Sequence, residues 1–289
     1  MTLSSSVKAC LKRVLKTDEF AVQSVGGGCI NQTYKLTLKN KRRFFCKVNV
    51  TDKLPGLFEK ERNGLGLLRK QYSIKVPEVV DVAVVENEQI ILLEWITSGK
   101  PHGKFWVSFG KQLAALHHAS ASYFGLNENN YMGSVLQINS QKDNWIEFFI
   151  ENRLQPLIKQ CVKINSLPAS DVRALEKLYI KLSEFFSVEK PSLLHGDLWN
   201  GNFMCNENNE PVLIDPAVYY GHRSVDIGMT TLFGGFSNGF YESYNYHFAF
   251  PVNYKEQWKI CNLYPLLIHL LLFGRSYLPQ IQQTLKYFS

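Results

Sequence analysis

The first third of the chain alternates between apolar and polar positions with the period of β-strands. Tyr34, Leu36 and Leu38 are separated by polar residues, and a period of two places apolar side chains on one face of a strand. Neighbouring segments are apolar over strand lengths or carry apolar residues at helical spacing. In chain order, the pattern predicts a helix over 1–19, strands over 20–25, 34–38, 43–50, 79–85 and 89–95, and a helix over 57–71.

Beyond residue 96 the apolar pattern becomes helical. Residues 97–101 (Thr-Ser-Gly-Lys-Pro) interrupt the strand pattern, and turn residues of this kind favour a boundary. We expect a small β-rich lobe, residues 1–96, and a larger, mostly helical lobe, residues 97–289. The fold class is therefore expected to be α+β with two lobes. The helices expected in the second lobe are 105–119, 143–162, 170–186, 254–273 and 276–287.

Three residues of the second lobe are suited to phosphate chemistry. Asp197 and Asn202 stand five positions apart in a polar loop between two short apolar segments, and Asp215 follows the second segment. Such a loop can direct the Asp197 carboxylate at a hydroxyl group, and the oxygens of Asn202 and Asp215 are ligands that Mg²⁺ prefers. The alternative is a pair of ordinary turns.

This loop resembles the catalytic loop and metal-binding Asp of the protein-kinase-like fold. The match consists of His-Gly-Asp at 195–197, Asn202 and Asp215, with Gly196 where protein kinases carry Arg. The resemblance implies a bilobal protein-kinase-like fold that uses ATP and Mg²⁺.

Three consecutive glycines, Gly26, Gly27 and Gly28, join two of the predicted strands. Dinucleotide-binding and Walker loops open a helix instead, and the Walker form also needs Gly-Lys followed by Ser or Thr. A glycine-rich hairpin lets backbone N–H groups approach a triphosphate without hindrance from Cβ atoms. On the kinase pattern, these glycines cover the nucleotide phosphates.

Lys47 lies within an apolar predicted strand. A lysine there is costly unless it is paired or extends its ammonium group to solvent. Glu61, on or near the apolar stripe of the following helix, is the favoured partner, and Glu59 is the competing one. A Lys–Glu pair of this kind positions nucleotide phosphates in kinases. The crossing between the lobes is then expected to contact adenine through the backbone of Glu94, Trp95 and Ile96.

Several motifs together resemble the fructosamine kinases, also called ketosamine-3-kinases, over roughly residues 20–275. His-Gly-Asp alone would also fit aminoglycoside phosphotransferases and choline kinases, and those acceptors, or a non-catalytic nucleotide-binding module, are the alternative functions. The motifs that narrow the match are Gly-Gly-Gly-Cys-Ile-Asn-Gln (26–32), the helix with Phe58, Glu61 and Gly64, His-Gly-Asp-Leu-Trp-Asn-Gly-Asn (195–202), Asp-Pro-Ala-Val-Tyr-Tyr-Gly-His-Arg (215–223) and Leu-Phe-Gly-Gly-Phe (232–236).

The family resemblance implies ATP-dependent phosphorylation of the 3-hydroxyl of a sugar joined to an amine through an Amadori linkage. The product is unstable and releases the amine, which is regarded as repair of glycated molecules. Asp197 would be the base that accepts the hydroxyl proton, and Asn202 and Asp215 would hold Mg²⁺. Lys47, paired with Glu61, would contact the nucleotide phosphates.

Aromatic residues near these motifs are candidates for the sugar side of the site, because aromatic faces suit sugar C–H surfaces. They are Trp199, Tyr219, Tyr220 and His222, and the alternative for each is plain packing. Most relatives would be expected to carry an acidic residue at the position of Ser224, so the substrate preference of this chain is open.

Two further polar residues receive structural roles. His117 lies in the predicted helix 105–119 and is expected to pack and hydrogen-bond rather than react. Asp226 is expected to support the catalytic loop through hydrogen bonds.

Composition narrows the range of partners. The 289 residues carry a net charge of +7 and a pI near 9.0, which favours anionic ligands. Because Lys and Arg are dispersed, we expect no nucleic-acid partner; with apolar runs too short to span a bilayer, we expect no membrane partner either. The expected partner is a ketoamine small molecule or a glycated protein side chain, and the chain could be a monomer or a dimer.

The six cysteines form no CxxC pair. With no secretory signal recognised at the N-terminus, a cytoplasmic location is expected. Cys29 stands beside the glycine triplet. Oxidation of its thiol would then hinder closure of the loop over ATP, and the alternative is an inert cysteine.

Overall fold

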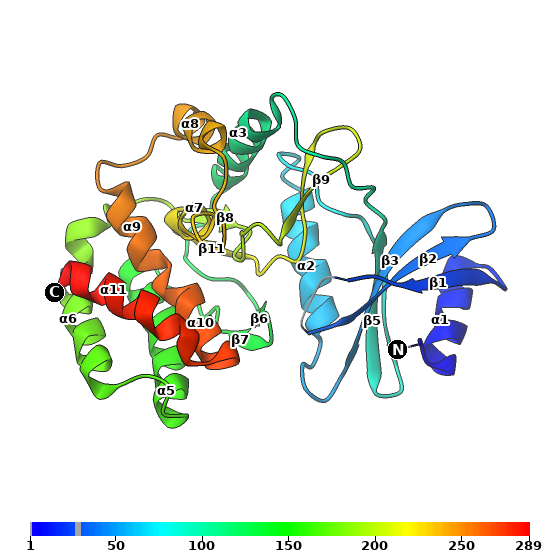
Figure 1. Cartoon of the computed structure of the whole chain (residues 1–289), viewed down its shortest axis with the longest axis horizontal. Helices are drawn as coiled ribbons and strands as arrows, with labels where there is room; N and C mark the ends of the chain where they lie inside the picture. The colour runs from blue at the N-terminus through cyan, green and yellow to red at the C-terminus, as the bar shows by residue number, and fades with distance from the viewer. Residues whose placement is uncertain (1, 27–29) are drawn as a thin grey trace.

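The computed structural model describes residues 2–26 and 30–289, and it has a β-sheet region followed by a helical region (Figure 1). The sheet has the strand order β1-β2-β3-β5-β4, and its neighbouring strands are antiparallel. The helix α1 (Ser5–Leu15) lies on one side of it and α2 (Leu57–Arg69) on the other. The strands are β1 (Phe20–Ser24), β2 (Gln32–Leu38), β3 (Arg43–Val50), β4 (Val79–Val85) and β5 (Glu88–Glu94).

The two faces of the sheet are covered by different parts of the chain, because successive residues of a strand point to opposite sides. Cys46 and Val48 of β3 pack into a core with α1, whereas Ile91 and Leu93 of β5 pack with α2. Lys47 stands between Cys46 and Val48, so the period of two directs it to the α2 side. The strand pattern alone therefore decides that this lysine meets α2.

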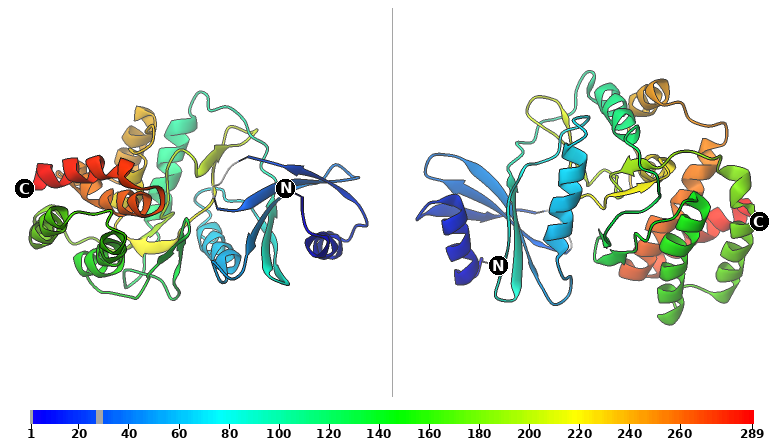
Figure 2. Two further views of the ribbon diagram at one scale, coloured as in Figure 1. Left: turned by 60° about the horizontal axis from the view of Figure 1, so that its bottom comes forward. Right: turned by 180° about the vertical axis from the view of Figure 1, so that it is seen from behind.

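The helical region combines helices with short two-stranded sheets, and Figure 2 shows it from two further sides. Its helices are α3 (Phe105–His117), α4 (Trp145–Phe148), the π-helix η1 (Phe149–Leu154), α5 (Gln155–Lys163), α6 (Ala169–Phe185), α7 (Ser224–Met229), α8 (Asn238–His247), α9 (Tyr254–Cys261), α10 (Leu263–Phe273), the 3₁₀-helix η2 (Arg275–Tyr277) and α11 (Leu278–Phe288). Two of these sheets are hairpins, which pair β6 (Asn130–Met132) with β7 (Val135–Gln137) and β9 (Phe203–Cys205) with β10 (Pro211–Leu213). The other sheet pairs β8 (Ser192–Leu194) with β11 (Tyr219–Gly221), which are not consecutive in the chain.

Two predicted helices are interrupted in the structure. The helix expected over 143–162 consists of α4, η1 and α5, and the side chain of Asn144 caps its start. The helix expected over 254–273 is divided at Asn262 into α9 and α10. Pro265 explains the second break, because it has no N–H to donate to the carbonyl of Cys261.

The α+β prediction is confirmed, and the short elements account for most of what the pattern missed. The helix α8 and the hairpin β6–β7 had not been predicted. None of the helices in residues 2–26 and 30–289 combines the length and the apolar character needed to span a bilayer.

Candidate active site

Lys47 is buried at the junction of the two regions and touches two carboxylates. Its Nζ lies 2.8 Å from Oε1 of Glu61 on α2 and 2.6 Å from Oδ1 of Asp215. Burial by itself would lower the pKa of Lys47, but the charges of Asp215 and Glu61 outweigh it and raise that pKa. The predicted Lys47–Glu61 pair is confirmed, whereas Glu59 pairs with Arg62 on the surface.

The loop that carries Asp197 is fixed from behind by Asp226. The backbone N–H groups of His195 and Gly196 donate to the two carboxylate oxygens of Asp226 at 2.7 and 2.8 Å. The same carboxylate lies 3.2 Å from Nε2 of His117, whose Nδ1 lies 2.7 Å from the hydroxyl of Tyr244. All these groups are buried, so Asp226 and His117 have the supporting roles predicted for them.

His195 links the loop that carries Asp197 to the segment before Asp215. Its Nδ1 accepts the N–H of Asp197 at 3.2 Å, and its Nε2 lies 2.9 Å from the carbonyl oxygen of Ile214. The first contact requires an unprotonated Nδ1, so Nε2 carries the proton and donates it to Ile214. Burial lowers the pKa of His195, which agrees with a neutral ring. One imidazole thus sets the spacing between the two loops.

Gly196 lets these loops approach. Its φ is +84°, a left-handed value that favours glycine, and a Cβ there would collide with the carbonyl oxygen of Ala217. Ala217 in turn donates its N–H to the carbonyl of His195 at 2.8 Å. The loop that carries Asp197 and the residues after Asp215 therefore form one rigid unit.

Asp197 and Asn202 contact each other directly. Nδ2 of Asn202 donates to the backbone oxygen and to Oδ2 of Asp197, both at 2.8 Å. Burial raises the pKa of Asp197 to about 7, although the hydrogen bond from Asn202 opposes the rise. A carboxyl group with a pKa near neutrality is suited to general-base chemistry.

The donor set on this side of the cavity fits a hard divalent cation. Asn202 uses its amide nitrogen toward Asp197, which directs its amide oxygen elsewhere, and Asp215 uses one carboxylate oxygen toward Lys47. Amide and carboxylate oxygens of this kind are ligands for Mg²⁺, which completes its shell with water and phosphate oxygens. Asp215 has a φ of +54°, an uncommon value for a residue with a side chain.

A cavity of about 220 Å³ brings the predicted residues together. Lys47 and Glu61 line it from the β-sheet region, and Asp197 and Trp199 line it from the helical region. Asn202 and Asp215 belong to the same wall. Six residues predicted from sequence therefore share one cavity.

His269 on α10 lines this cavity as well and was not predicted. Its Nδ1 lies 2.8 Å from the carbonyl oxygen of Pro265, so Nδ1 donates and Nε2 remains an acceptor. The ring of Phe233 lies between His269 and Trp199, with ring centroids 4.8 and 5.8 Å away. His269 is the one imidazole in the apolar run 263–273, and that contrast was the available signal.

Comparison with known proteins gives one family. The family model described as fructosamine kinase matches residues 3–288. The chain belongs to the fructosamine kinase family. It is 37% identical over 272 residues to a probable ketoamine kinase of Enterococcus faecium, covering 91% of this chain and 94% of that one. It is 35% identical to the chloroplastic protein-ribulosamine 3-kinase of Oryza sativa, covering 89% of this chain and 75% of the other.

Solved structures agree with this family. A crystal structure assigned to a fructosamine-3-kinase of Thermobifida fusca matches with a TM-score of 0.89 at 30% identity, covering 98% of both chains. A macrolide 2′-phosphotransferase matches with a TM-score of 0.59 at 13% identity over 99% of both chains, which shows the shared fold alone. The predicted protein-kinase-like fold is thereby confirmed.

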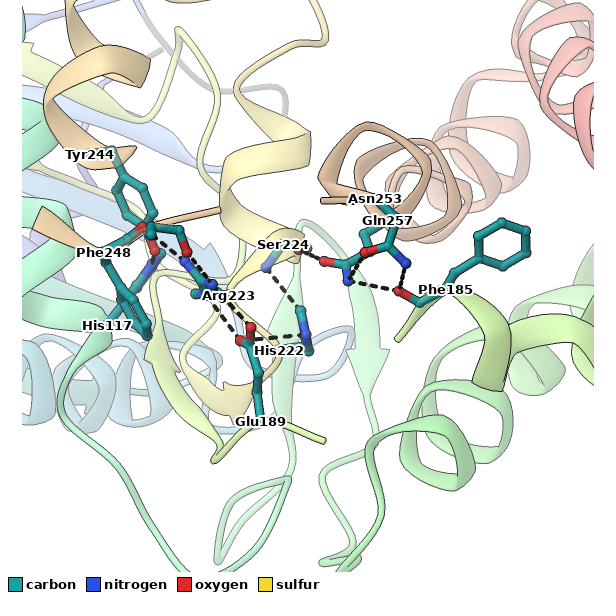
Figure 3. A network of polar contacts seen from close by, with 11 residues as sticks. His117, Phe185, Glu189, His222, Arg223, Ser224, Tyr244, Phe248, Asn253 and Gln257 are labelled. Carbon is teal, nitrogen blue, oxygen red and sulfur yellow. Dashed lines mark hydrogen bonds and ion pairs between the residues drawn. The ribbon is translucent and has the colours of Figure 1, made fainter. Parts of the chain in front are cut away.

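In this member of the fructosamine kinase family, two of the residues predicted to contact the sugar do not reach the cavity. Tyr219 and His222 are buried to 0% and 1% exposure and do not line the cavity. His222 packs between the rings of Trp145 and Phe186, and its Nδ1 accepts the N–H of Ser224 at 3.2 Å. Figure 3 shows it inside a polar network with Glu189. Packing, the alternative considered for both residues, is what the structure shows.

Tyr220 also lies away from the cavity. Its backbone pairs with Gly125, and its ring lies 6.2 Å from that of Tyr123. It lines a separate hollow beside α2. Strand geometry explains the difference, because neighbouring residues of β11 point to opposite faces: Tyr219 packs in the core and Tyr220 faces this hollow. Trp199 alone of the four candidates reaches the cavity.

The remaining residues predicted to contact the nucleotide are Glu94, Trp95 and Ile96, at and after the end of β5. The strand β5 ends at Glu94, whose N–H donates to the carbonyl of Glu78 at 2.8 Å. The ring of Trp95 lies near Phe45 and beneath Nζ of Lys35, and Ile96 is buried. Their contact with adenine stays a prediction.

The glycine loop is described only in part. At Gly26 the described residues leave open space where a Cβ would lie, whereas Gly27, Gly28 and Cys29 lie outside the described residues. Ser224 donates to the side-chain oxygen of Gln257 at 2.7 Å in the buried network of Figure 3. That contact is remote from the cavity lining, so it gives no reason for an altered substrate preference.

Proposed function

We propose that this protein is an ATP-dependent kinase that phosphorylates the 3-hydroxyl of ketosamines and so starts the release of a sugar from an amine. The observation that carries the proposal is the position of Asp197: it lines one cavity with Lys47, Asn202 and Asp215, and burial raises its pKa to about 7. Membership of the fructosamine kinase family supports the choice of a ketosamine as acceptor.

In the proposed reaction, the Asp197 carboxylate accepts the proton of the sugar hydroxyl while the oxygen of that hydroxyl attacks the γ-phosphorus of ATP. The bond between that phosphorus and the β,γ-bridging oxygen breaks, and ADP leaves. Lys47 donates to phosphate oxygens from a position fixed by Glu61. A divalent cation bound by Asn202 and Asp215 would neutralise charge on the phosphates. Phosphoryl transfer depends mainly on such positioning and charge neutralisation.

The acceptor side of the cavity suits a sugar. Trp199 and His269 offer ring faces to sugar C–H surfaces, and the unprotonated Nε2 of His269 can accept a hydroxyl hydrogen bond. Ile30 and Leu272 contribute apolar surface to the same lining. We assign this side to the sugar and its attached amine, and the Gly26 loop and residues 94–96 to the nucleotide.

A panel of acceptors tests the proposal. ATP consumption would be measured with Mg²⁺ and fructosyl-lysine, ribulosyl-lysine, glycated peptides, an aminoglycoside and choline. We expect turnover with at least one ketoamine, with phosphate found on the 3-hydroxyl by phosphorus NMR. Turnover with the aminoglycoside or choline alone would replace this proposal by a phosphotransferase for another hydroxyl compound.

A non-catalytic nucleotide-binding module is the third possibility, and the presence of Lys47, Asp197, Asn202 and Asp215 in one cavity argues against it. Calorimetry with Mg·ATP would separate binding from turnover.

The five cysteines in the described part of the chain are buried free thiols, which supports a proposed cytoplasmic location.

A further inference from the structure

Arg153 is the most deeply buried cation in the helical region, and the proposed reaction does not use it. Its side chain is 0% exposed. Within residues 2–26 and 30–289, no carboxylate forms an ion pair with it. A buried charge without an opposite charge is destabilising unless its surroundings satisfy it. Such a residue needs an explanation beyond packing.

Three aromatic rings and three oxygen atoms surround the guanidinium group. Its central carbon lies 4.0 Å from the ring centre of Tyr219, 4.5 Å from Phe148 and 5.3 Å from Tyr264. Nη1 donates to the backbone oxygens of Ile138 and Asn152, and Nη2 donates to Oδ1 of Asn139 at 2.7 Å.

The π-helix η1 brings Arg153 to this place. Pro156 follows it in the first turn of α5 and has no N–H for the carbonyl of Asn152, and Arg153 satisfies that carbonyl instead. A π-turn inside a helix often accompanies a functional site.

Arg153 also sets the direction of a chain of buried amides. A guanidinium group can only donate, so Asn139 must present its oxygen to Arg153. Nδ2 of Asn139 then donates to Oδ1 of Asn130 at 2.9 Å, and Nδ2 of Asn130 donates to the carbonyl of Val218 at 2.8 Å. The amide orientations are thus consistent from the charge to the carbonyl of Val218, and the carbonyl of Glu128, which accepts from Nδ2 of Asn139 at 3.0 Å, supports the same orientation of Asn139.

Gln137 forms a second branch. Its Nε2 donates to Oδ1 of Asn130 at 2.7 Å and to the carbonyl of Ala217 at 3.0 Å, and its oxygen accepts the hydroxyl of Tyr264 at 2.9 Å. The network therefore ends on two consecutive carbonyls, those of Ala217 and Val218. These are the second and third residues after Asp215, with only Pro216 between.

We propose that Arg153 is a positioning residue for the metal ligand Asp215, acting through Asn139, Asn130 and Gln137. The amides fix residues 217 and 218 from one side, and His195 accepts the N–H of Ala217 from the other. Asp215 thereby keeps its left-handed backbone, with φ of +54°, and presents its carboxylate to the cavity. The inference rests on the proposed function, because it assigns Asp215 to a metal–nucleotide complex.

Two variants separate this role from simple packing. Arg153→Met keeps much of the volume but removes the donors, so Oδ1 of Asn139 loses the charged partner that holds it. Asn139→Asp gives Arg153 a carboxylate partner but removes the donor to Asn130, so it breaks the amide chain while keeping the guanidinium satisfied. Arg153→Lys retains a charge and is the conservative rescue. Arg173→Met, at an exposed arginine on α6, is the matched control.

The readout is binding of Mn²⁺ in the presence of a non-hydrolysable ATP analogue, followed by electron paramagnetic resonance, with unfolding temperature measured in parallel. We expect affinity for Mn²⁺ to fall about 10–100-fold in Arg153→Met and in Asn139→Asp, as for other groups that orient metal ligands. Arg153→Lys should recover part of it. Asn139→Asp should unfold within a few degrees of the wild type, and Arg173→Met should bind as the wild type does.

Unchanged Mn²⁺ affinity in a folded Asn139→Asp would overturn the inference, even if Arg153→Met failed to fold. A wild-type protein that bound neither Mn²⁺ nor the nucleotide analogue would instead overturn the proposed function and the inference with it.

Discussion

At the scale of single residues, Lys47 is the clearest case of charge deciding geometry. Its ammonium group is buried between the carboxylates of Glu61 and Asp215. Removal of the charge of one carboxylate would therefore shift the ammonium group toward the other. A hydrogen bond between charged groups contributes roughly 1.5–3 kcal/mol. Glu61 is therefore expected to keep Lys47 from being drawn wholly to Asp215.

Glu61→Gln tests that balance. The neutral amide retains the shape of Glu61 but not its charge, so Lys47 is expected to favour Asp215 over the nucleotide. The KM for ATP should rise about 10–100-fold, in line with the energy of one charged hydrogen bond. Glu59→Gln is the matched control on the same helix, since Glu59 pairs with Arg62 at the surface. Equal KM values for the two variants would contradict the assignment.

His222 gives a prediction about pH. Burial lowers its pKa to about 4, with Glu189 opposing and Arg223 adding to the fall, whereas an unfolded histidine has a pKa of about 6.5. Between these values the unfolded chain binds a proton that the folded chain does not, so the free energy of unfolding decreases as pH falls from about 6.5 to about 4.

The variant His222→Gln should remove this part of the acid sensitivity. Between pH 7 and pH 5, the wild type should lose about 2 kcal/mol more unfolding free energy than the variant in denaturant titrations. His102→Gln, at an exposed histidine, should follow the wild type. Parallel curves for wild type and His222→Gln would show that His222 does not carry the effect.

Residues marked by their side-chain chemistry and spacing were easier to predict from the sequence than residues whose position depends on tertiary packing. Asp197, Asn202 and Asp215 are marked by their spacing, and Glu61 by the helix that directly follows the strand of Lys47. Tyr219 and His222 share a motif with Asp215 but face the core, because only the three-dimensional course of β11 decides which side chains reach the cavity. His269 approaches from a distant helix, and spacing along the chain could not indicate that.

At the scale of elements, the catalytic loop depends on close contact with the residues after Asp215. Gly196→Ala should disturb this contact, because its φ is +84° and a Cβ would meet the carbonyl of Ala217. We expect the free energy of unfolding to fall by more than about 1 kcal/mol, with a loss of kcat. Gly66→Ala is the matched control, since Gly66 lies in the helix α2 with open space around it.

The control should be neutral or stabilising by up to about 1 kcal/mol, as expected for a helix interior. If Gly196→Ala were as stable and active as Gly66→Ala, the two loops would not form the rigid unit described above.

The limits of prediction at this scale are also physical. Apolar periodicity identified the long helices, but a π-turn and a proline break leave that periodicity almost intact. The interruption at η1 lies just before Pro156, which has no N–H to donate, and the one at Asn262 lies three residues before Pro265, which lacks an N–H as well. Short strands such as β6 and β7 carry too few residues to establish a period.

At the scale of the whole molecule, the two regions meet at the cavity through the Lys47–Asp215 pair. The α2 helix is also tied to the helical region, since Nδ2 of Asn63 donates to Glu128 at 2.8 Å and Lys60 lies 3.6 Å from the same carboxylate. The alternation in β3 places Lys47 on the α2 side, and α2 supplies its first partner. The second partner, Asp215, lies 168 positions away, and only the fold brings it close.

One measurement tests the central claim most directly: single-turnover transfer of phosphate from Mg·ATP to a ketoamine by the wild type and by Asp197→Asn. Loss of a positioned general base typically lowers the rate about 10²–10⁴-fold. We expect a loss of that size, with Mg·ATP binding in the variant unchanged within a few-fold by calorimetry. A variant that transferred phosphate at the wild-type rate would contradict the assignment of Asp197 as the base, and with it the mechanism proposed for this site.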